Sequence, residues 1–359
     1  MKVQQDIPLA PLTTLGVGGL ARYFIEATTL DDVKRAAAFA VTRARDLFVL
    51  GGGSNLLVAD RGYRGMVMKM SLRGIREKGI APDGRRIFSV AAGEPWDSFV
   101  AHVIAQNCAG IECLSGIPGT VGGTPIQNVG AYGQEVSETI HAVRVLDLES
   151  MEVVTLSPAE CGFAYRSSIF NTSMRGRYIV LVVEYALTPG GAPRIEYADL
   201  KRWLAEHAPA SGTPTLAETR DAVRAIRHGK AMLIVEGDED CRSAGSFFKN
   251  PIVSETDFAR ITEAATRMAK QQPPKYPAQT DATADLQFKT SAAWLVENAG
   301  FTKGTVRGNV GISRKHALAL VNRGGASASE FVEFKKEIQK KVFAEFGVSL
   351  HPEPVFLGF

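Results

Sequence analysis

The sequence has few cysteines, and their spacing gives them no evident chemistry. Four of the 359 residues are cysteine, at Cys108, Cys113, Cys161 and Cys241. None stands in a CxxC pair, and no histidine lies near them at the spacing typical of metal ligands. The pattern therefore favours four reduced thiols over disulfides or a metal site, and we expect no bound metal.

The sequence also lacks a strong charge and a long apolar run. Lys and Arg number 41 against 38 Asp and Glu, a net charge of +3. Such a balance favours neither nucleic acid nor a membrane surface as a partner. No stretch approaches the roughly 20 apolar residues of a membrane span, and Met1 to Gly19 has no signal-peptide pattern. We therefore expect a cytoplasmic protein that acts on small molecules. We also expect a monomer.

The length and patterning predict a mixed architecture. A chain of 359 residues is long enough for two or three domains with cores of their own. Helices and strands do not alternate regularly, so we expect an α+β fold and not a doubly wound parallel sheet. The main expected helices are 31–45, 216–228 and one after Gly325 with a stripe of apolar residues. The main expected strands are 47–50, 86–91, 142–148, 178–187, 317–321 and 348–350.

A first glycine segment follows the predicted strand at 47–50. The run Gly51-Gly52-Gly53-Ser54-Asn55 lets the backbone turn and approach a ligand closely. Successive backbone N–H groups in such a turn form a concave site for phosphate oxygens. The run has no P-loop lysine and does not match GxGxxG. On its own the run favours a tight structural turn.

A second and longer glycine-rich loop spans Gly116 to Gly133. It reads GIPGTVGG and continues as QNVGAYG. A loop of this length with little secondary structure is usually functional, and its small residues would let a flat ring lie against the backbone. Asn128 and Tyr132 offer hydrogen bonds to the edge of such a ring. The apolar members of the loop argue against a merely solvated surface loop.

Three shorter stretches are weak signals individually. In Tyr165–Ser168 an arginine could bind a carboxylate through two hydrogen bonds, or form a structural salt bridge. Ala244–Pro251 reads AGSFFKNP and could be a core strand that leaves a turn. The third stretch, LHPEP at 350–354, puts a glutamate between two prolines near the C-terminus, where loose surface residues are the rule.

Together and in this order, the five stretches resemble one family from residue 12 to residue 359. They are similar to the UDP-N-acetylenolpyruvoylglucosamine reductases, in the longer type with a substrate-capping tyrosine loop. The resemblance implies the FAD-binding fold of the vanillyl-alcohol oxidase type. It further implies two FAD-clasping α+β parts, residues 1–70 and 71–235, with the tail 351–359 near the first. Residues 236–350 would form a C-terminal α+β substrate-binding domain.

The resemblance also implies a reaction and the residues that carry it. NADPH and FAD would reduce the enolpyruvyl ether of a UDP-sugar, with FAD held non-covalently, as a step of peptidoglycan precursor synthesis. The catalytic positions are Arg166, Ser246 and Glu353. Arg166 and Glu353 would bind and polarise the carboxylate of the enolpyruvyl group. Ser246 would donate the proton that completes the reduction.

Further positions follow from the same resemblance. The residues implied in cofactor binding are Gly51, Gly52, Gly53, Ser54, Asn55, Ile117, Pro118, Gly119, Thr120, Val121, Gly122, Gly123, Asn128, Ala131, Tyr132 and Gly133. The residues implied in substrate binding are Tyr197, Lys230, Asn250 and Tyr276. The sequence departs from the family after Lys230, where Ala231-Met232-Leu233 replaces the usual Leu-Pro pair. His316 lies where the family has a polar residue on the nucleotide side.

Two rival functions remain open at this point. One keeps the fold and makes the protein an FAD oxidase of a small alcohol or sugar. The absence of a histidine from both glycine stretches argues against a covalently tethered flavin of that kind. The other rival is a UDP-sugar binding or transfer protein without redox chemistry, which would purify without colour.

Overall fold

The computed structural model describes residues 3–207, 212–277 and 287–359. The chain divides into two compact units that each combine segments distant in sequence. Unit 1 comprises Met1–Ile7, Leu20–Gly53 and Tyr63–Leu233. Unit 2 comprises Pro8–Gly19, Ser54–Gly62 and Ile234–Phe359. The first glycine segment therefore crosses from unit 1 to unit 2 between Gly53 and Ser54.

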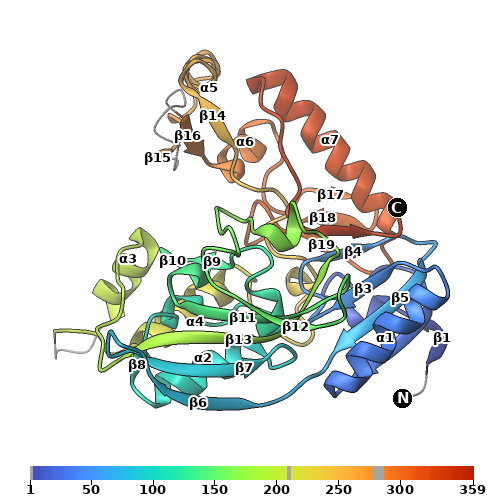
Figure 1. The fold of residues 1–359 in the computed structure, drawn as a ribbon. Helices are drawn as coiled ribbons and strands as arrows, with labels where there is room; N and C mark the ends of the chain where they lie inside the picture. Colours follow the sequence, from blue (N-terminus) through green and yellow to red (C-terminus); the bar gives the residue numbers. More distant parts are fainter. Residues whose placement is uncertain (1–2, 208–211, 278–286) are drawn as a thin grey trace. The chain divides into compact units, whose positions relative to one another are not determined.

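The first sheet of unit 1 is built from the N-terminal strands. Its order is β1 (Gln4–Pro8), β2 (Leu20–Ala27), β5 (Tyr63–Met70) and β3 (Leu47–Leu50). β5 pairs in parallel with both β2 and β3. Helix α1 (Leu30–Thr42) packs on this sheet (Figure 1). The predicted helix 31–45 is thus confirmed, but it ends at Thr42.

The second sheet of unit 1 is antiparallel. Its order is β12 (Val153–Leu156), β11 (Ile140–Asp147), β13 (Tyr178–Pro189), β7 (Arg86–Ala91) and β6 (Ile75–Ile80), with β8 (Cys108–Ala109) pairing with the end of β13. Buried and more exposed residues alternate in β7, as expected for a strand covered on one face. In contrast, β11 and β13 are buried along most of their length. This sheet carries the segments that position the glycine-rich loop.

Unit 1 also has helices and short turns, one of which lies inside the glycine-rich loop. The helices are α2 (Trp96–Ala105), α3 (Ala198–His207) and α4 (Leu216–Gly229). The 3-10 turns are η2 (Glu112–Leu114), η3 (Val121–Gly123), η4 (Val136–Glu138) and η5 (Ile169–Asn171). A short pair of strands, β9 (Gly130–Ala131) and β10 (Gln134–Glu135), ends the loop. Thr215 caps α4 through a reciprocal contact with Glu218, which sets where that helix starts.

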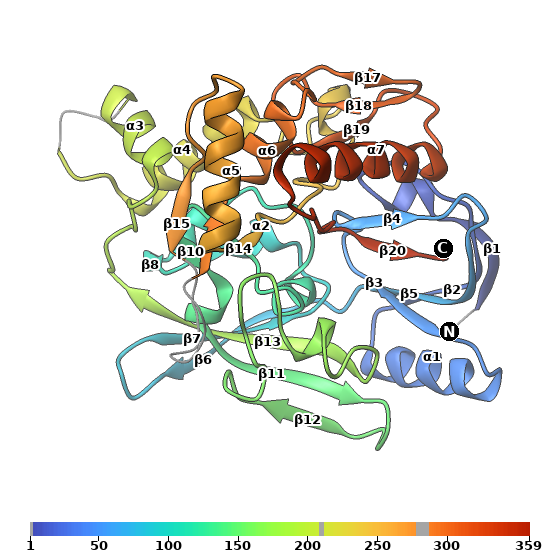
Figure 2. The same cartoon turned by 90° about the horizontal axis from the view of Figure 1, so that it is seen from above.

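The described part of unit 2 forms three small sheets. One has the order β14 (Ile252–Ser254), β16 (Gln287–Thr290) and β15 (Lys275–Pro277), and another has β17 (Val306–Arg307), β18 (Val310–Ile312) and β19 (Leu320–Asn322). The third is the parallel pair of β4 (Leu56–Val58) and β20 (Val355–Leu357), seen side by side in Figure 2. The remaining elements are η1 (Ala10–Leu12), η6 (Glu239–Cys241), α5 (Glu255–Arg267), α6 (Ala292–Asn298) and α7 (Ala328–Phe346).

Helix α7 supplies much of the core of unit 2. Its buried stripe, Phe331, Phe334, Ile338 and Val342, was expected from the spacing of apolar residues. The helix ends at Gly347, whose φ of 68° is the left-handed conformation that glycine adopts at helix ends. Two strand predictions need correction nearby. Residues 348–350 form no strand, because the terminal strand is β20, and the strand expected at 317–321 is β19, which starts at Leu320.

The predicted α+β class is confirmed by these sheets and helices. All four cysteines are buried and none forms a disulfide. Within the described residues, no helix is both long enough and apolar enough to cross a lipid bilayer.

Candidate active site

The two glycine stretches, 65 residues apart in sequence, lie against each other in unit 1. A Cβ atom built on Gly52 would lie 2.6 Å from the Cα of Gly119, and one built on Gly51 would lie 2.8 Å from the Thr120 Oγ1. Only glycine permits so close an approach of two backbones. The structure thus joins Gly51–Gly53 and Ile117–Gly123 into one surface made largely of main chain.

The middle of the glycine-rich loop is fixed by main-chain hydrogen bonds. Val121 N–H donates to the Glu94 carbonyl over 2.9 Å, and Gly122 N–H donates to the Ala92 carbonyl over 2.8 Å. The Trp96 N–H donates to the Gly119 carbonyl over 3.1 Å. These bonds tie the loop to the turn between β7 and α2, so its backbone has a defined path.

The entry of the glycine-rich loop is held by charged side chains from two helices. The Asp97 carboxylate of α2 accepts from the Gly116 N–H over 2.6 Å and from Arg220 Nη1 over 2.6 Å. Arg224 Nη1 donates to the same carboxylate over 2.5 Å. Arg227 Nε donates to the Gly116 carbonyl over 3.1 Å. Both main-chain groups of Gly116 are therefore bound by side chains.

The local charges shift the pKa values of this cluster. Burial would raise the pKa of Asp97, but hydrogen bonds from Arg220 and from the Gly116 N–H outweigh it, so the pKa lies below its ordinary 3.8. Burial lowers the pKa of the Arg227 guanidinium, which is only 7% exposed. The Tyr132 hydroxyl also interacts with Arg227. Arg227 thus connects the start of the glycine-rich loop with its end.

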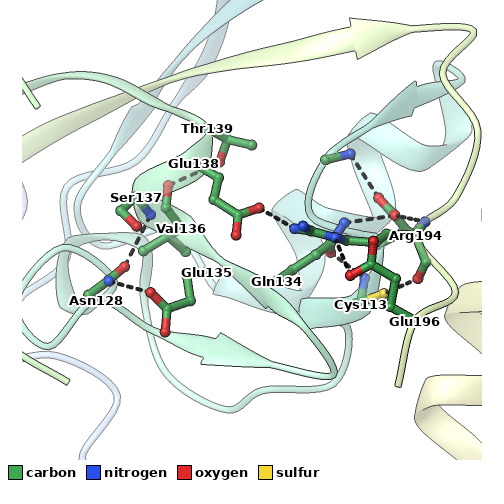
Figure 3. Close-up of polar contacts among 12 residues, drawn as sticks. Cys113, Asn128, Gln134, Glu135, Val136, Ser137, Glu138, Thr139, Arg194 and Glu196 are labelled. Carbon is green, nitrogen blue, oxygen red and sulfur yellow. Dashed lines mark hydrogen bonds and ion pairs between the residues drawn. The ribbon is translucent and has the colours of Figure 1, made fainter. Parts of the chain in front are cut away.

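The end of the glycine-rich loop is organised around Asn128, a residue that is 1% exposed. Its amide nitrogen donates to Glu135 Oε2 over 2.8 Å, and its amide oxygen accepts from the Ser137 N–H (Figure 3). The amide nitrogen also donates to the Ala164 carbonyl over 3.1 Å. The Asn128 side chain therefore holds the loop together. The predicted contact of this amide with a flavin ring stays a prediction.

Arg166, a predicted catalytic residue, lies against the same part of the loop. Its Nη2 donates to the Gly130 carbonyl over 2.7 Å, and its Nη1 donates to the Asn128 carbonyl over 3.4 Å. Arg166, Asn128 and Tyr132 have φ values of 54°, 45° and 50°. Non-glycine residues in this region of φ and ψ cost free energy, of order 1–3 kcal/mol each, and gather at functional sites.

Two of the predicted substrate-binding residues meet near Tyr132. The Tyr132 and Tyr197 rings contact edge to face, with centroids 5.3 Å apart. Lys230, directly after α4, places its Nζ 2.6 Å from Asp199 Oδ2 in the first turn of α3. The hydrogen bond from Lys230 lowers the pKa of Asp199. Lys230 thus lies in one cluster with Tyr132 and Tyr197 despite the unusual residues that follow it.

In unit 2, main-chain pairing brings together the segments that carry Ser246 and Glu353. Glu353 N–H donates to the Phe247 carbonyl over 2.9 Å, and Lys249 N–H donates to the His351 carbonyl over 3.0 Å. Phe248 and Pro352 form a β-bridge between these bonds. Ser246 and Glu353 are both half-buried. The tail around Glu353, where loose surface residues are the rule, is therefore ordered beside the segment that carries Ser246.

The same region of unit 2 includes Asn55 of the first glycine segment. The Val355 N–H donates to the Asn55 carbonyl over 3.0 Å, and the Asn55 amide donates to the Glu353 carbonyl over 3.4 Å. Phe247 is buried, with Phe331 stacked on one side and Phe356 edge-on. These contacts fix the backbone on both sides of Ser246 and Glu353.

The remaining predicted residues lie in other elements of unit 2. The Asn250 amide oxygen accepts from the Ala292 N–H at the start of α6, over 2.9 Å. Tyr276 is exposed on β15, and residues 278–286 that follow it lie outside the described part of the chain. His316 Nδ1 accepts from the Leu318 N–H over 3.0 Å. Arg166 belongs to unit 1, whereas Ser246 and Glu353 belong to unit 2.

The residues present fit a flat, phosphate-bearing cofactor. A Cβ atom built on exposed Gly123 meets no described atom within 4 Å, so one side of the loop is open main chain. The adjoining turn at Gly51–Gly53 has Gly53 at a φ of 65°, the conformation expected of a phosphate-binding turn. Among residues 3–207, 212–277 and 287–359, no group of three metal-ligating side chains is placed to hold a metal ion.

Sequence reasoning missed the charged residues that hold the glycine-rich loop. Arg220, Arg224 and Arg227 are spaced by four and three residues, which places them on one face of a helix. This row of basic residues on one helix face could have been recognised in the sequence as a site for an acidic partner. Its carboxylate partner, Asp97, is 123 residues before the first of them, and nothing in the local pattern connects the two.

Comparisons with known proteins agree with this geometry. A family model described as "FAD binding domain" matches residues 21–157, and one described as "UDP-N-acetylenolpyruvoylglucosamine reductase, C-terminal domain" matches residues 237–357. The UDP-N-acetylenolpyruvoylglucosamine reductase of Thermobifida fusca is 45% identical over 358 residues, 99% of this chain and 98% of that one. The protein of the same name from Salinispora arenicola is 44% identical, over 98% of this chain and 94% of its own.

A solved structure from the same group of reductases also matches this chain. The UDP-N-acetylenolpyruvylglucosamine reductase of Thermus caldophilus superimposes with a TM-score of 0.65 and 25% identity, over 99% of both chains. The predicted FAD-binding fold is confirmed by this match and by the FAD-binding domain model. The chain belongs to the UDP-N-acetylenolpyruvoylglucosamine reductase family.

Proposed function

We propose that this protein reduces the enolpyruvyl ether of UDP-N-acetylglucosamine-enolpyruvate to UDP-N-acetylmuramate, with NADPH as the reductant. Near-full-length identity to reductases of this name is the observation that carries the proposal. The protein is an FAD-containing oxidoreductase of that family. Its reaction is a cytoplasmic step of peptidoglycan precursor synthesis, and so serves cell-wall biogenesis, cell shape and cell division. It acts as a monomer, without nucleic acid or membrane.

FAD would be held non-covalently by the main-chain surface that Gly51–Gly53 and Ile117–Gly123 share. Ser54 and Asn55 extend the phosphate-binding turn, and Ala131 to Gly133 border the end of the loop. When bound, FAD supplies the hydride transfer that connects NADPH to the terminal carbon of the enolpyruvyl group. The sheet of residues 4–70 and the sheet of residues 75–189 are separate, which supports two FAD-clasping parts, 1–70 and 71–235. Residues 236–350 form the substrate-binding domain.

The protein's own residues account for the rest of the reaction. Hydride addition to the terminal carbon leaves negative charge on the neighbouring carbon and on its carboxylate. Arg166 and Glu353 bind that carboxylate and stabilise the developing charge. Ser246 donates its hydroxyl proton to the carbon, which completes the change from C=C to CH–CH₃. An enolate is basic enough to accept a proton from an alcohol as weakly acidic as serine.

Substrate binding falls to four further residues. Tyr197 and Lys230 lie in one cluster with Tyr132 in unit 1, a placement that supports their joint contact with the UDP-sugar. Asn250 follows the Ser246 segment directly, and exposed Tyr276 caps the UDP group. His316 is a weaker candidate on the nucleotide side.

The test is direct. Purified protein is mixed with NADPH and the enolpyruvyl UDP-sugar, and the product is identified by mass spectrometry. We expect a mass gain of two hydrogens, with NADPH consumed in equal amount. Acid precipitation should release FAD into the supernatant. A colourless protein would refute the function, and flavin that stays with the pellet would refute non-covalent binding.

A further inference from the structure

Glu112 places a carboxylate in the interior of unit 1, at the start of η2 and four residues before the glycine-rich loop. It is 1% exposed. Its Oε2 accepts from the Gly110 N–H over 2.8 Å, and its Oε1 accepts from Gln134 Nε2 over 2.8 Å and from the Arg194 N–H over 2.9 Å. Three N–H donors from three separate segments therefore converge on one buried carboxylate.

The three N–H donors require a hydrogen-bond acceptor at the position of the Glu112 side chain. Burial of a carboxylate is unfavourable unless hydrogen bonds replace its water, and here three N–H groups do so. A glutamine in its place would turn an NH₂ group toward at least one of these donors. A buried donor opposed by a donor loses its hydrogen bond and stays desolvated. The carboxylate is thus suited to joining these segments in a way that an amide of the same shape is not.

The joined segments are those that shape the predicted sugar-nucleotide site. Gln134 directly follows the glycine-rich loop, and its amide oxygen also accepts from the Cys113 N–H over 2.8 Å. Arg194 lies three residues before Tyr197, and its guanidinium pairs with Glu138 over 2.6 Å and with Glu196 over 3.2 Å (Figure 3). The Tyr197 ring then meets Tyr132 of the glycine-rich loop. Glu112 therefore binds, in the interior of unit 1, the two segments that carry Tyr132 and Tyr197.

We propose that Glu112 is a positioning residue for UDP-sugar binding, which sets where Tyr197 lies relative to the glycine-rich loop. The proposal rests on the proposed function, because the substrate role of Tyr197 follows from that reaction. Glu112 acts through Arg194 and Gln134 and does not itself touch the substrate. Its loss should therefore weaken binding of the UDP-sugar and leave reduction of the flavin by NADPH unchanged.

The test compares Glu112→Gln with Glu138→Gln. We expect Glu112→Gln to raise the KM for the UDP-sugar roughly tenfold with a much smaller change in kcat. Flavin reduction by NADPH, followed in a stopped-flow instrument without the sugar, should match the parent rate. Amide hydrogen exchange should become faster in the peptide that contains Arg194 to Tyr197. Glu138→Gln removes an exposed ion pair of the same arginine and should stay within twofold of the parent KM.

A further variant, Glu112→Asp, keeps an acceptor-only carboxylate on a shorter side chain and guards against loss of folding. It should show an intermediate KM and intermediate exchange. A folded Glu112→Gln protein with the parent KM and exchange would overturn the proposal, and so would equal effects of Gln and Asp. Should Glu112→Gln fail to fold, an unchanged KM in Glu112→Asp would overturn it. An inactive parent protein would instead refute the proposed function, while the exchange comparison would still test the role of Glu112.

Discussion

The glycine-rich loop of unit 1 and the C-terminal tail of unit 2 are both irregular, yet they are ordered in different ways. Charged side chains bind the entry of the loop: the Asp97 carboxylate accepts from the Gly116 N–H, and Arg227 donates to the Gly116 carbonyl. The tail is ordered by main-chain pairing, as Glu353 bonds to Phe247 and β20 pairs with β4. Side chains thus bind the entry of the loop, whose middle is bonded through the main chain, whereas main-chain pairing orders the tail beside Phe247 and β4.

Ordering by main-chain pairing and ordering by side-chain hydrogen bonds place different demands on the side chains of a segment. Main-chain pairing places little demand on side-chain identity, so a paired segment can present Glu353 for chemistry. The entry of the loop, which side chains bind, depends on those side chains for its shape. We therefore expect substitutions in the tail region to change the chemistry without unfolding the protein. Substitutions at the entry of the loop should change stability, and substitutions on its open main-chain surface should change cofactor affinity.

Ser246→Ala should have the largest effect on the chemical step. It removes the proposed proton donor, and general acid catalysis contributes roughly 10²–10⁴-fold. Oxidation of the reduced flavin by the UDP-sugar should slow by that factor, with flavin reduction by NADPH and thermal stability nearly unchanged. Stopped-flow absorbance separates the two half-reactions. Turnover at the parent rate would leave Ser246 as only a packing residue after Gly245.

Glu353→Gln should follow, with a loss of roughly 10²–10³-fold in the same half-reaction, because one group that stabilises the developing charge is weakened. The main-chain bond to Phe247 should survive, so the variant should fold and bind FAD normally. Glu345→Gln is the matched control, since Glu345 pairs with Lys341 on the exposed face of α7. Equal behaviour of the two variants would remove Glu353 from the catalytic group.

Asp97→Asn tests the loop side of the comparison. It breaks a partly buried contact with two arginines and should lower the free energy of unfolding by about 1–3 kcal/mol at neutral pH. The pKa of Asp97 is lowered in the folded state, so its contribution is present above the ordinary 3.8 and is lost as pH falls through the lower folded value. Urea unfolding at several pH values should therefore show the two proteins converging in acid.

The matched control for Asp97→Asn is Asp31→Asn, which breaks an exposed pair with Arg35 on α1. That change should stay within about 0.5 kcal/mol of the parent. Equal losses in the two variants would contradict the claim that the loop depends on the charged group at its entry.

Gly123→Ala should have the smallest effect and the most local one. The added methyl group meets no described atom, so the apoprotein should keep its stability. Crowding against a bound flavin should weaken FAD binding by roughly tenfold, as measured by fluorescence titration. Gly229→Ala at the end of α4, another open site, is the control and should bind FAD as the parent does. Unchanged FAD affinity in Gly123→Ala would place the cofactor elsewhere.

The sequence predicted those parts of the fold that have a strong local signal. Strands β3 and β7 match their predicted bounds, and the buried stripe of α7 follows from its apolar spacing. Strand β6 gave no usable signal, because it is an exposed edge strand whose IREKGI sequence carries charges. Strand β20 was placed too early at 348–350, because its partner β4 lies about 300 residues away and no local pattern reveals such pairing.

The candidate site was predictable to a similar degree. Glycine stretches, the GSFFKNP segment and the glutamate between prolines are visible as motifs, and their order identified the family. The carboxylates that bind the glycine-rich loop and the segments beside it, such as Asp97 and Glu112, act through hydrogen bonds to residues far away in the sequence. An isolated acidic residue has no spacing pattern, so only the fold reveals its role.

The most direct test of the whole account is an anaerobic two-step mixing experiment with the parent protein, followed by flavin absorbance. The first mix adds one equivalent of NADPH, which should bleach the flavin. The second adds the enolpyruvyl UDP-sugar, which should restore the oxidised spectrum without oxygen and yield one UDP-N-acetylmuramate per flavin. A flavin that stays bleached with the UDP-sugar and reoxidises only when oxygen is admitted would contradict the account and favour an oxidase.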